Sequence, residues 1–170
     1  MNPISSLVFV LLLTVFPTQI FCNLIDQACG YTSFPILCHQ TLTPDAEALA
    51  ATDLKTIAKV ALKYTESDAE DLDNQIIKLM QSESNADVKR ALSSCSDYFL
   101  TVVEKIQAAQ YSISSVSNYA QAKAWLAEAL VNIQRCDQVF AGKPFKSPIS
   151  DSTTKLGRLE SNAVAIISKL

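Results

Sequence analysis

Residues 119–140 read YAQAKAWLAEALVNIQRCDQVF. Apolar or small side chains recur in this stretch at steps of three and four: Tyr119, Ala122, Leu126, Ala129, Ile133, Cys136 and Phe140. That spacing is typical of an α-helix with one buried face, because positions three and four apart lie above one another on the helix surface. The stretch therefore predicts an amphipathic helix of about six turns whose apolar stripe faces a core.

Three further segments of the chain have the same period. One begins near Thr52 or Asp53, either of which can cap a helix; the next spans about 86–110; the last begins near Ser150. Their stripes are Leu54, Ala58, Ala61, Thr65, Ala69, Leu72, Ile76 and Leu79, then Val88, Leu92, Cys95, Phe99, Val102, Ile106 and Ala109, then Leu156, Leu159, Ala163, Ile166 and Leu170. Four amphipathic helices with short links predict an up-and-down antiparallel four-helix bundle over residues 52–170.

A shorter unit precedes the bundle. Residues 23–40 contain two brief helical stretches separated by Gly30 and Pro35, which predicts a small helical hairpin. Such a hairpin has almost no core of its own, so a covalent bridge is expected to hold it together. The predicted fold is therefore all-α, with a short N-terminal hairpin before the bundle.

Five cysteines occur: Cys22, Cys29, Cys38, Cys95 and Cys136. If export removes the first, four remain, and four cysteines permit three pairings. Cys95 and Cys136 each lie on the apolar stripe of their own helix, which favours a bridge between them and a local bridge from Cys29 to Cys38. A zinc site is the competing use of four cysteines, but no C-x₂₋₄-C spacing is present.

The export prediction comes from the first residues. Residues 4–16 (ISSLVFVLLLTVF) form an apolar run, and the first charged side chain is Asp26. The run is too short for a membrane span but suits the hydrophobic region of a secretory signal peptide. Because the usual positive n-region is missing, an uncleaved anchor or a buried core helix is the alternative. We expect residues 1–22 to be a signal peptide, cleaved after Cys22, and residues 23–170 to form one domain.

The charge balance limits the choice of partner. The formal net charge is −3 and all charged residues follow residue 22, so no basic patch is available to neutralise phosphates. We therefore expect no nucleic-acid partner, and no membrane partner once the signal peptide is removed.

Candidate catalytic and metal-binding residues are few. His39 has no carboxylate at fixed local spacing, and the carboxylates between Glu66 and Asp73 lie opposite an apolar stripe without an EF-hand pattern. Trp125 and Tyr119 are more typical of a core or its edge than of a cofactor site. The sequence thus predicts no catalytic residue, no metal site, no cofactor and no enzyme activity. A small-molecule carrier that uses the bundle core is an alternative.

Five segments in order resemble one family along nearly the whole of the chain after residue 22. Residues 29–38 (CGYTSFPILC) resemble Cys-x-x-Thr-x-(Tyr/Phe)-Pro-x-x-Cys, and residues 91–98 (ALSSCSDY) are similar to an Ala-Leu-x-x-Cys segment. Residues 125–130 (WLAEAL) and 136–140 (CDQVF) resemble Trp-Leu-Ser-Ala-Ala-Leu and Cys-x-Asp-x-Phe, and residues 161–166 (SNAVAI) resemble Ser-Asn-Ala-Leu-Ala-Ile. This order is similar to the plant invertase inhibitor and pectin methylesterase inhibitor family.

The resemblance implies a four-helix bundle after a hairpin, with first-to-second and third-to-fourth disulfides, in agreement with the pairing favoured above. It also implies a secreted protein inhibitor of the plant cell wall, or apoplast, that forms a one-to-one complex with a carbohydrate-active enzyme. Family members acting on pectin methylesterase lay bundle helices across the pectin-binding cleft, whereas members acting on invertase place a loop-proximal segment in the sucrose site. We expect the free protein to be a monomer.

The region around Asn118 bears on the target. Invertase inhibitors often carry Pro-Lys-Phe there, whereas residues 117–121 read SNYAQ, which together with the Trp-Leu-x-x-Ala-Leu stretch favours pectin methylesterase. Ala127 and Glu128 replace the usual Ser and Ala. The predicted partner-binding residues are Asn118, Tyr119, Gln121 and Glu128. An inhibitor of cell-wall or vacuolar acid invertase is the alternative, and a non-inhibitory, allergen-type wall or pollen protein with the same fold is the second alternative.

Overall fold

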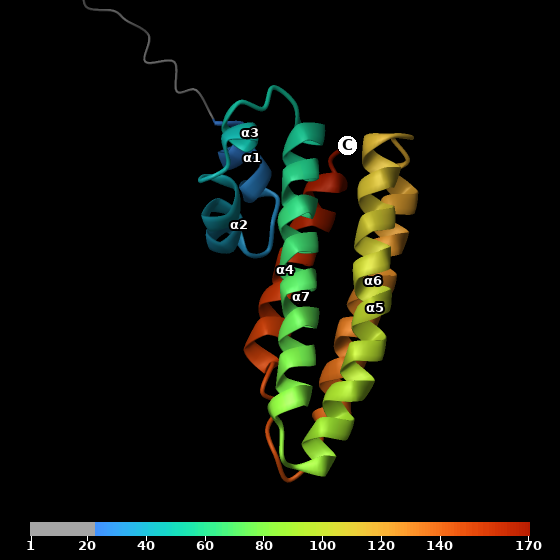
Figure 1. Ribbon diagram of the computed structural model, residues 1–170. Coiled ribbons are helices and arrows are strands. Elements are labelled where there is room, and N and C mark those ends of the chain that lie inside the picture. Colours follow the sequence, from blue (N-terminus) through green and yellow to red (C-terminus); the bar gives the residue numbers. More distant parts are fainter. Residues whose placement is uncertain (1–22) are drawn as a thin grey trace, which may run out of the picture.

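A computed structural model describes residues 23–170, and the predicted signal peptide lies outside these residues. Four long helices form the body of the molecule: α4 (Leu54–Ser82), α5 (Ala86–Ser114), α6 (Tyr119–Phe140) and α7 (Ser150–Ile167). They run alternately down and up and pack side by side, so the predicted all-α, up-and-down bundle is confirmed (Figure 1). No helix within the described range is both long and apolar enough to cross a bilayer.

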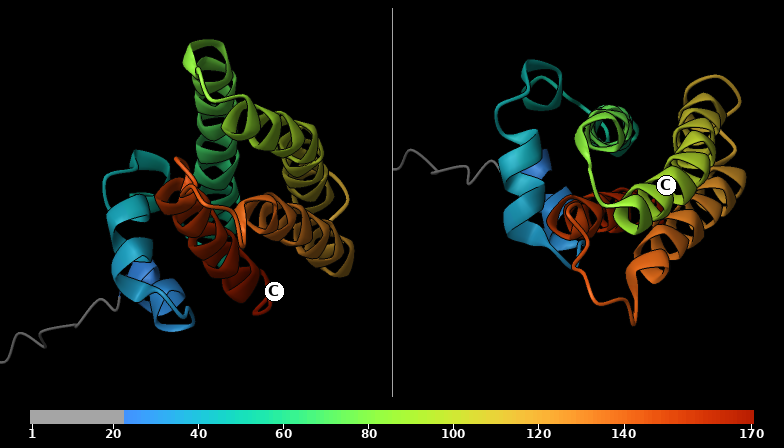
Figure 2. Two further views of the ribbon diagram at one scale, coloured as in Figure 1. Left: turned by 90° about the horizontal axis from the view of Figure 1, so that it is seen from below. Right: turned by 60° about the horizontal axis from the view of Figure 1, so that its bottom comes forward.

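The N-terminal unit has one more helix than the sequence predicts. It comprises α1 (Leu24–Gly30), α2 (Pro35–Leu42) and α3 (Ala46–Leu49), and α2 continues two residues beyond the predicted hairpin. Asp45 caps α3 by accepting hydrogen bonds from the N–H groups of Glu47 and Ala48, 2.9 and 3.0 Å away. Figure 2 shows this unit beside α4 and α7, on the side of the bundle away from α5 and α6.

The core follows the predicted stripes. All seven predicted positions of α5 are buried, and so are those of α6 except Tyr119, which is partly buried against the core. At the end of the α7 stripe, Leu170 is 39% exposed because it lies beyond the helix. Three residues outside the α4 stripe are also buried, Ile57, Val60 and Leu62. The start of α4 is buried on more than one side, because the N-terminal unit covers a flank that a bare bundle would expose.

The helix caps agree with the sequence at α4 and differ at α5. Asp53 caps α4 by accepting a hydrogen bond from the Thr56 N–H group at 2.7 Å. The spacing of Ser84 and Asp87 suggests a capping pair for α5, but the cap is Asn85, which accepts from the N–H groups of Asp87 and Val88. An asparagine amide oxygen reaches these groups as well as a serine hydroxyl does, so both residues satisfy the same preference.

Two disulfides bridge the predicted cysteines. Cys29 is bonded to Cys38 within the hairpin and Cys95 to Cys136 between α5 and α6, with Cα–Cα separations of 5.5 and 4.6 Å. This is the local pairing that the apolar stripes favour. All four cysteines are buried, so the bridges belong to the core.

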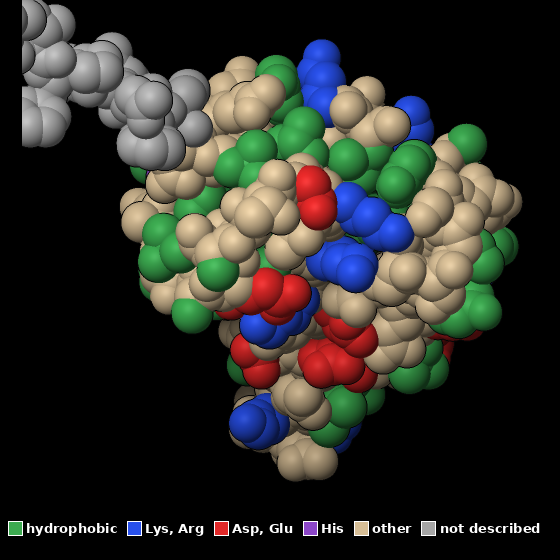
Figure 3. Space-filling model, turned by 90° about the horizontal axis from the view of Figure 1, so that it is seen from above, with side chains coloured by type: hydrophobic (Ala, Val, Ile, Leu, Met, Phe, Trp, Pro, Cys, Tyr) green, Lys and Arg blue, Asp and Glu red, His purple; other side chains and the backbone are tan. Residues whose placement is uncertain are grey.

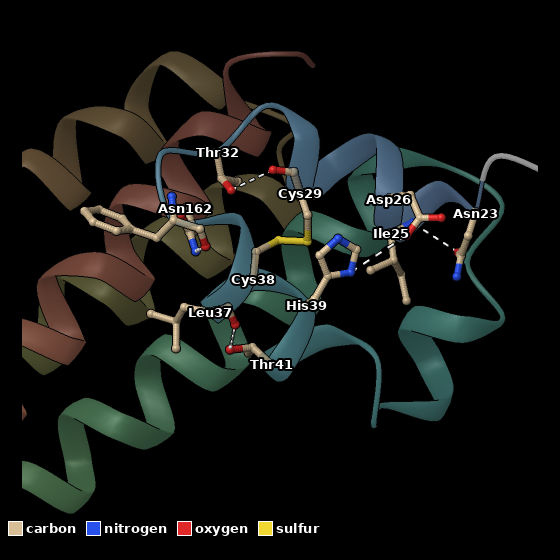
Figure 4. Close-up of a disulfide and its surroundings, with 11 residues drawn as sticks. Asn23, Ile25, Asp26, Cys29, Thr32, Leu37, Cys38, His39, Thr41 and Asn162 are labelled. Atoms are coloured by element: carbon tan, nitrogen blue, oxygen red, sulfur yellow. Dashed lines mark hydrogen bonds and ion pairs between the residues drawn. A yellow bond between two sulfur atoms is a disulfide. The ribbon is translucent and has the colours of Figure 1, made fainter.

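One side chain of α7 ties the hairpin to the bundle. Asn162 accepts a hydrogen bond from the Phe34 N–H group at 3.2 Å and donates one to the Phe34 carbonyl oxygen at 3.0 Å. Figure 4 shows Asn162 close to the hairpin that the Cys29–Cys38 bridge closes. Because Asn162 is 3% exposed, these two hydrogen bonds, which we call the Asn162 clasp, are shielded from water.

Candidate partner-binding surface

The four predicted partner-binding residues lie on α6 or at its start, but they do not share one environment. Asn118, Gln121 and Glu128 are spaced by three and seven residues, so they follow one face of the helix. Tyr119 belongs instead to the apolar stripe and packs against the core. Asn118 and Glu128 are roughly 15 Å apart along the helix, at 1.5 Å per residue.

The turn before α6 is held in place by hydrogen bonds from three helices. The Asn118 side chain caps α6 by accepting from the Gln121 N–H group at 3.0 Å, and the Asn118 N–H group donates to the Ser112 carbonyl oxygen at 2.9 Å. Ser117 has a φ of 50°, a left-handed conformation that is unusual for serine. Its hydroxyl accepts a hydrogen bond from the Lys55 ammonium group at 2.9 Å. Asn118 is therefore exposed, but its side chain and its N–H group already take part in hydrogen bonds within the protein.

Figure 3 views the molecule from this end. Acidic and basic side chains lie close together in the middle of this view, and hydrophobic side chains lie around them.

The middle of α6 carries an ordered charged cluster. The Lys105 ammonium group, from α5, lies 4.3 Å from the centre of the Trp125 ring and 3.2 Å from the Glu128 carboxylate. A second carboxylate, that of Glu104, lies 3.8 Å from the same ammonium group. The Lys105 side chain is only 19% exposed, whereas Glu128 is 52% exposed. Lys105 thus holds the Glu128 carboxylate in a set position at the surface.

A shallow hollow lies beside this cluster on α6. Its volume is about 360 Å³, and it is lined by Ala127, Glu128, Val131, Asn132 and Arg135. Asn132 donates to the Glu128 carbonyl oxygen at 2.8 Å, and Arg135 donates to the Asn132 side chain at 3.4 Å. Val131 is 44% exposed. Two of these lining residues, Ala127 and Glu128, are the positions at which the sequence departs from the family pattern.

We call this surface the α5–α6 face: Gln121, Trp125, Glu128, Asn132 and Arg135 along α6, with Lys105 from α5. The sequence did not single out Lys105, because it lies off the apolar stripe of α5 and resembles any exposed lysine. Its role arises from the packing of α5 against α6, which the Cys95–Cys136 bridge fixes.

His39 lies apart from this face, on α2. Its Nδ1 atom is 3.8 Å from an Asp26 carboxylate oxygen, and both side chains are well exposed (Figure 4). The cysteines beside it, Cys29 and Cys38, are bonded to each other and offer no thiol nucleophile.

The acidic residues of α4 lie in three different settings. Glu70 and Asp71 are exposed, as a solvated helix face requires. Asp68 instead accepts a hydrogen bond from Lys155 and joins α4 to α7. Burial raises the pKa of Asp73 above its ordinary value. Within residues 23–170, no group of three or more His, Cys, Asp or Glu side chains is arranged to hold a metal ion.

Fold and surface together define a small, disulfide-bridged helical protein with a partly exposed helix face of paired polar side chains. The model of the plant invertase/pectin methylesterase inhibitor family matches residues 23–166, which is most of the chain. The chain therefore belongs to this family of enzyme inhibitors.

Two curated proteins of Arabidopsis thaliana are similar in sequence. Pectinesterase inhibitor 11 is 25% identical over 163 residues, which cover 86% of this chain and 79% of that protein. Putative pectinesterase/pectinesterase inhibitor 26 is 21% identical over 162 residues, which cover 87% of this chain but 17% of that longer protein.

Solved structures share the fold. A mutant form of a pectin methylesterase inhibitor from Arabidopsis matches with a TM-score of 0.73 and 18% identity, over 86% of this chain and 96% of the other. The structure of a pectin methylesterase inhibitor from Arabidopsis thaliana matches with a TM-score of 0.65 and 18% identity, over 86% and 95%. At this identity the likeness establishes the fold alone.

Proposed function

We propose that this protein is a secreted inhibitor of pectin methylesterase that forms a one-to-one complex and blocks the pectin-binding cleft of the enzyme. It acts in the apoplast, is a monomer when free, and has no catalytic activity of its own. The observation that carries the proposal is the ordered α5–α6 face on a chain that belongs to an enzyme-inhibitor family.

The α5–α6 face suits an inhibitor for a physical reason. Binding costs free energy when flexible side chains become fixed, by about 0.5–1.5 kcal/mol for each long side chain. Here Lys105 holds Glu128, and Asn132 holds Arg135, before any partner arrives. Trp125 adds a large, partly buried ring beside these charges. Trp and Arg, which this face presents as Trp125 and Arg135, are among the residues that most often dominate the binding energy of a protein interface.

The choice of pectin methylesterase over invertase rests on the sequence. The turn before α6 reads Ser117-Asn118-Tyr119, without the Pro-Lys-Phe triplet that invertase inhibitors often carry. Both curated relatives have names that refer to pectinesterase. We therefore propose pectin methylesterase as the target, and acid invertase as the alternative.

A titration of the purified protein into a plant pectin methylesterase and an acid invertase tests the target. Loss of pectin methylesterase activity with one-to-one stoichiometry is the expected result. Loss of invertase activity alone would instead assign the alternative target. If neither activity falls at micromolar excess, the inhibitor proposal is wrong and a non-inhibitory protein of the same fold remains.

The substitution Glu128→Lys tests the face itself. It reverses a charge beside Lys105, so we expect inhibition to weaken by about tenfold or more. Glu47→Lys is the matched control, because Glu47 is an exposed residue of α3 on the other side of the bundle. Circular dichroism checks that both variants remain folded. Equal inhibition by the two variants would show that the α5–α6 face is not the contact surface.

A further inference from the structure

A second surface, unconnected with the α5–α6 face, lies where the N-terminal hairpin meets α7. It is a groove of about 680 Å³. Its floor is apolar and is formed by Phe34, Pro35, Ile36 and Leu37 at the start of α2. Ile36 is 75% exposed, more than any other large hydrophobic side chain of residues 23–170. Ile36 therefore adds exposed apolar surface to the side chains that line the groove.

One end of this groove is positively charged. The Arg158 guanidinium lies 5.3 Å from the centre of the Phe34 ring, and among residues 23–170 no carboxylate lies within ion-pair distance of it. The start of α2 adds to this charge, since Phe34 provides no side-chain cap and the first-turn N–H groups of Ile36 and Leu37 have no partner within the helix. An anion bound at this end would contact both the Arg158 guanidinium and the first-turn N–H groups of α2.

The other end of the groove has the opposite charge. Asp151, Thr154, Lys155 and Arg158 line one side of it at steps of three and four along α7. Lys155 is already paired with Asp68 of α4. Asp151 and Arg158 are seven residues apart, or roughly 10 Å along the helix. A bound segment would therefore place its carboxylate near Arg158 and a donor group near Asp151.

The location of the groove sets it apart from the surface assigned to the target enzyme. The hairpin and α7 lie on one side of the bundle, and α5 and α6 lie on the other (Figure 2). The hairpin wall is also fixed, because the Cys29–Cys38 bridge and the Asn162 clasp hold it against α7 (Figure 4). The groove is thus a preformed surface that remains open when the α5–α6 face is occupied.

We propose that the groove between α2 and α7 binds a peptide segment of a partner protein in which an aspartate or glutamate adjoins an apolar side chain. The carboxylate pairs with Arg158 and the first turn of α2, and the apolar side chain covers Ile36. This partner is additional to the enzyme that the α5–α6 face binds, and the proposal does not depend on which enzyme that is.

Nuclear magnetic resonance tests the proposal with defined probes. The ¹⁵N-labelled protein, with both disulfides formed, is titrated with a blocked peptide containing Leu-Glu-Leu and with its twin containing Leu-Lys-Leu. Shifts confined to Ser33–Leu37 and to α7 around Arg158 are expected for the glutamate peptide, with binding about tenfold weaker for the lysine twin. Shifts elsewhere, equal binding of both peptides, or no shift with either would overturn the proposal.

Two double variants complete the test. Ile36→Ser with Arg158→Glu removes the exposed apolar side chain and reverses the charge, so the preference should change from the glutamate to the lysine peptide. Leu100→Ser with Arg90→Glu makes the same changes at exposed positions on α5 and should leave binding unchanged. The ¹⁵N spectra report whether each variant is folded. A groove variant that keeps its preference for the glutamate peptide would contradict the proposal.

Discussion

At the scale of single residues, Asn162 shows how one amide group places a whole unit. Its side chain satisfies both backbone groups of Phe34, which lies 128 positions earlier in the chain. The amide carries its acceptor and its donor on two separate atoms, so one short side chain bonds the N–H group and the carbonyl oxygen of the same residue. This accounts for the Ser-Asn-Ala segment in physical terms.

Replacement of Asn162 by alanine should release the hairpin without unfolding the bundle. The variant leaves the N–H group of Phe34 without a partner, at a cost of about 1–3 kcal/mol, whereas the Phe34 carbonyl oxygen keeps the hydrogen bond from the Cys38 N–H group. Hydrogen exchange should become faster in α1 and α2 and stay unchanged in α5 and α6. Asn132→Ala is the control, since Asn132 bonds within its own helix and to Arg135. Uniformly faster exchange throughout the Asn162 variant would contradict a local role.

At the scale of elements, the two disulfides bridge units of different kinds. Cys95–Cys136 joins two long helices that already pack along their length, whereas Cys29–Cys38 closes a hairpin of seven- and eight-residue helices. The hairpin depends on its bridge for its local shape because it has little core of its own. The bundle bridge instead closes a longer loop and therefore restricts the unfolded chain more.

Removal of each bridge should have a different effect. The chain-entropy model assigns about 4 kcal/mol to the Cys95–Cys136 loop and about 2.5 kcal/mol to the hairpin loop. Cys95→Ser with Cys136→Ser should therefore lower the urea midpoint of the whole molecule by the larger amount. Cys29→Ser with Cys38→Ser should mainly speed hydrogen exchange in α1 and α2. A larger global loss from the hairpin variant would reverse this ranking.

At the scale of the whole molecule, one buried carboxyl group links stability to pH. Glu160 is 1% exposed, and within the described residues neither of its carboxyl oxygens has a hydrogen-bond partner. Burial raises the pKa of Glu160 from 4.5 to about 8, an effect that the backbone of Leu130 opposes only in part. Glu160 directly follows Leu159, a residue of the predicted apolar stripe. The helical period alone therefore did not determine whether the Glu160 side chain is buried or exposed.

The free energy of unfolding should therefore fall as pH rises from 4.5 to about 8. Across this window the folded protein keeps a proton on Glu160 that the unfolded chain releases, at up to about 1.4 kcal/mol per pH unit. Asp45 and Asp53 act in the opposite direction, because hydrogen bonds from the backbone of Ala48 and Thr56 lower their pKa values. Their contribution to stability is lost as pH falls below the ordinary aspartate range. Maximum stability is expected in mildly acidic solution.

Urea unfolding at several pH values across this window measures the effect. Glu160→Gln, which cannot ionise, should unfold with nearly constant free energy over the same range and be more stable than the parent protein at the alkaline end. Glu47→Gln, an exposed substitution on α3, should leave the profile unchanged. A parent protein whose stability does not change between these limits would show that Glu160 is solvated in solution.

Much of the architecture follows from the chain alone. The stripe of residues 119–140 and its three counterparts predicted the long helices, because the period of a helix is local and each amphipathic face needs a covering partner. The positions of Cys95 and Cys136 on those stripes favoured the bridge that the structure contains. The predicted contact residues Gln121 and Glu128 share a face for the same local reason.

Other features were decided by tertiary structure, because they join residues that no local period relates. The docking of the hairpin depends on Phe34 and Asn162, and the setting of Glu128 depends on Lys105 from a different helix. The groove of Ile36 and Arg158 exists only where α2 lies against α7. The sequence by itself determined the helices, their buried stripes and the favoured cysteine pairing. The packing of those helices decided which polar side chains became buried, paired or exposed.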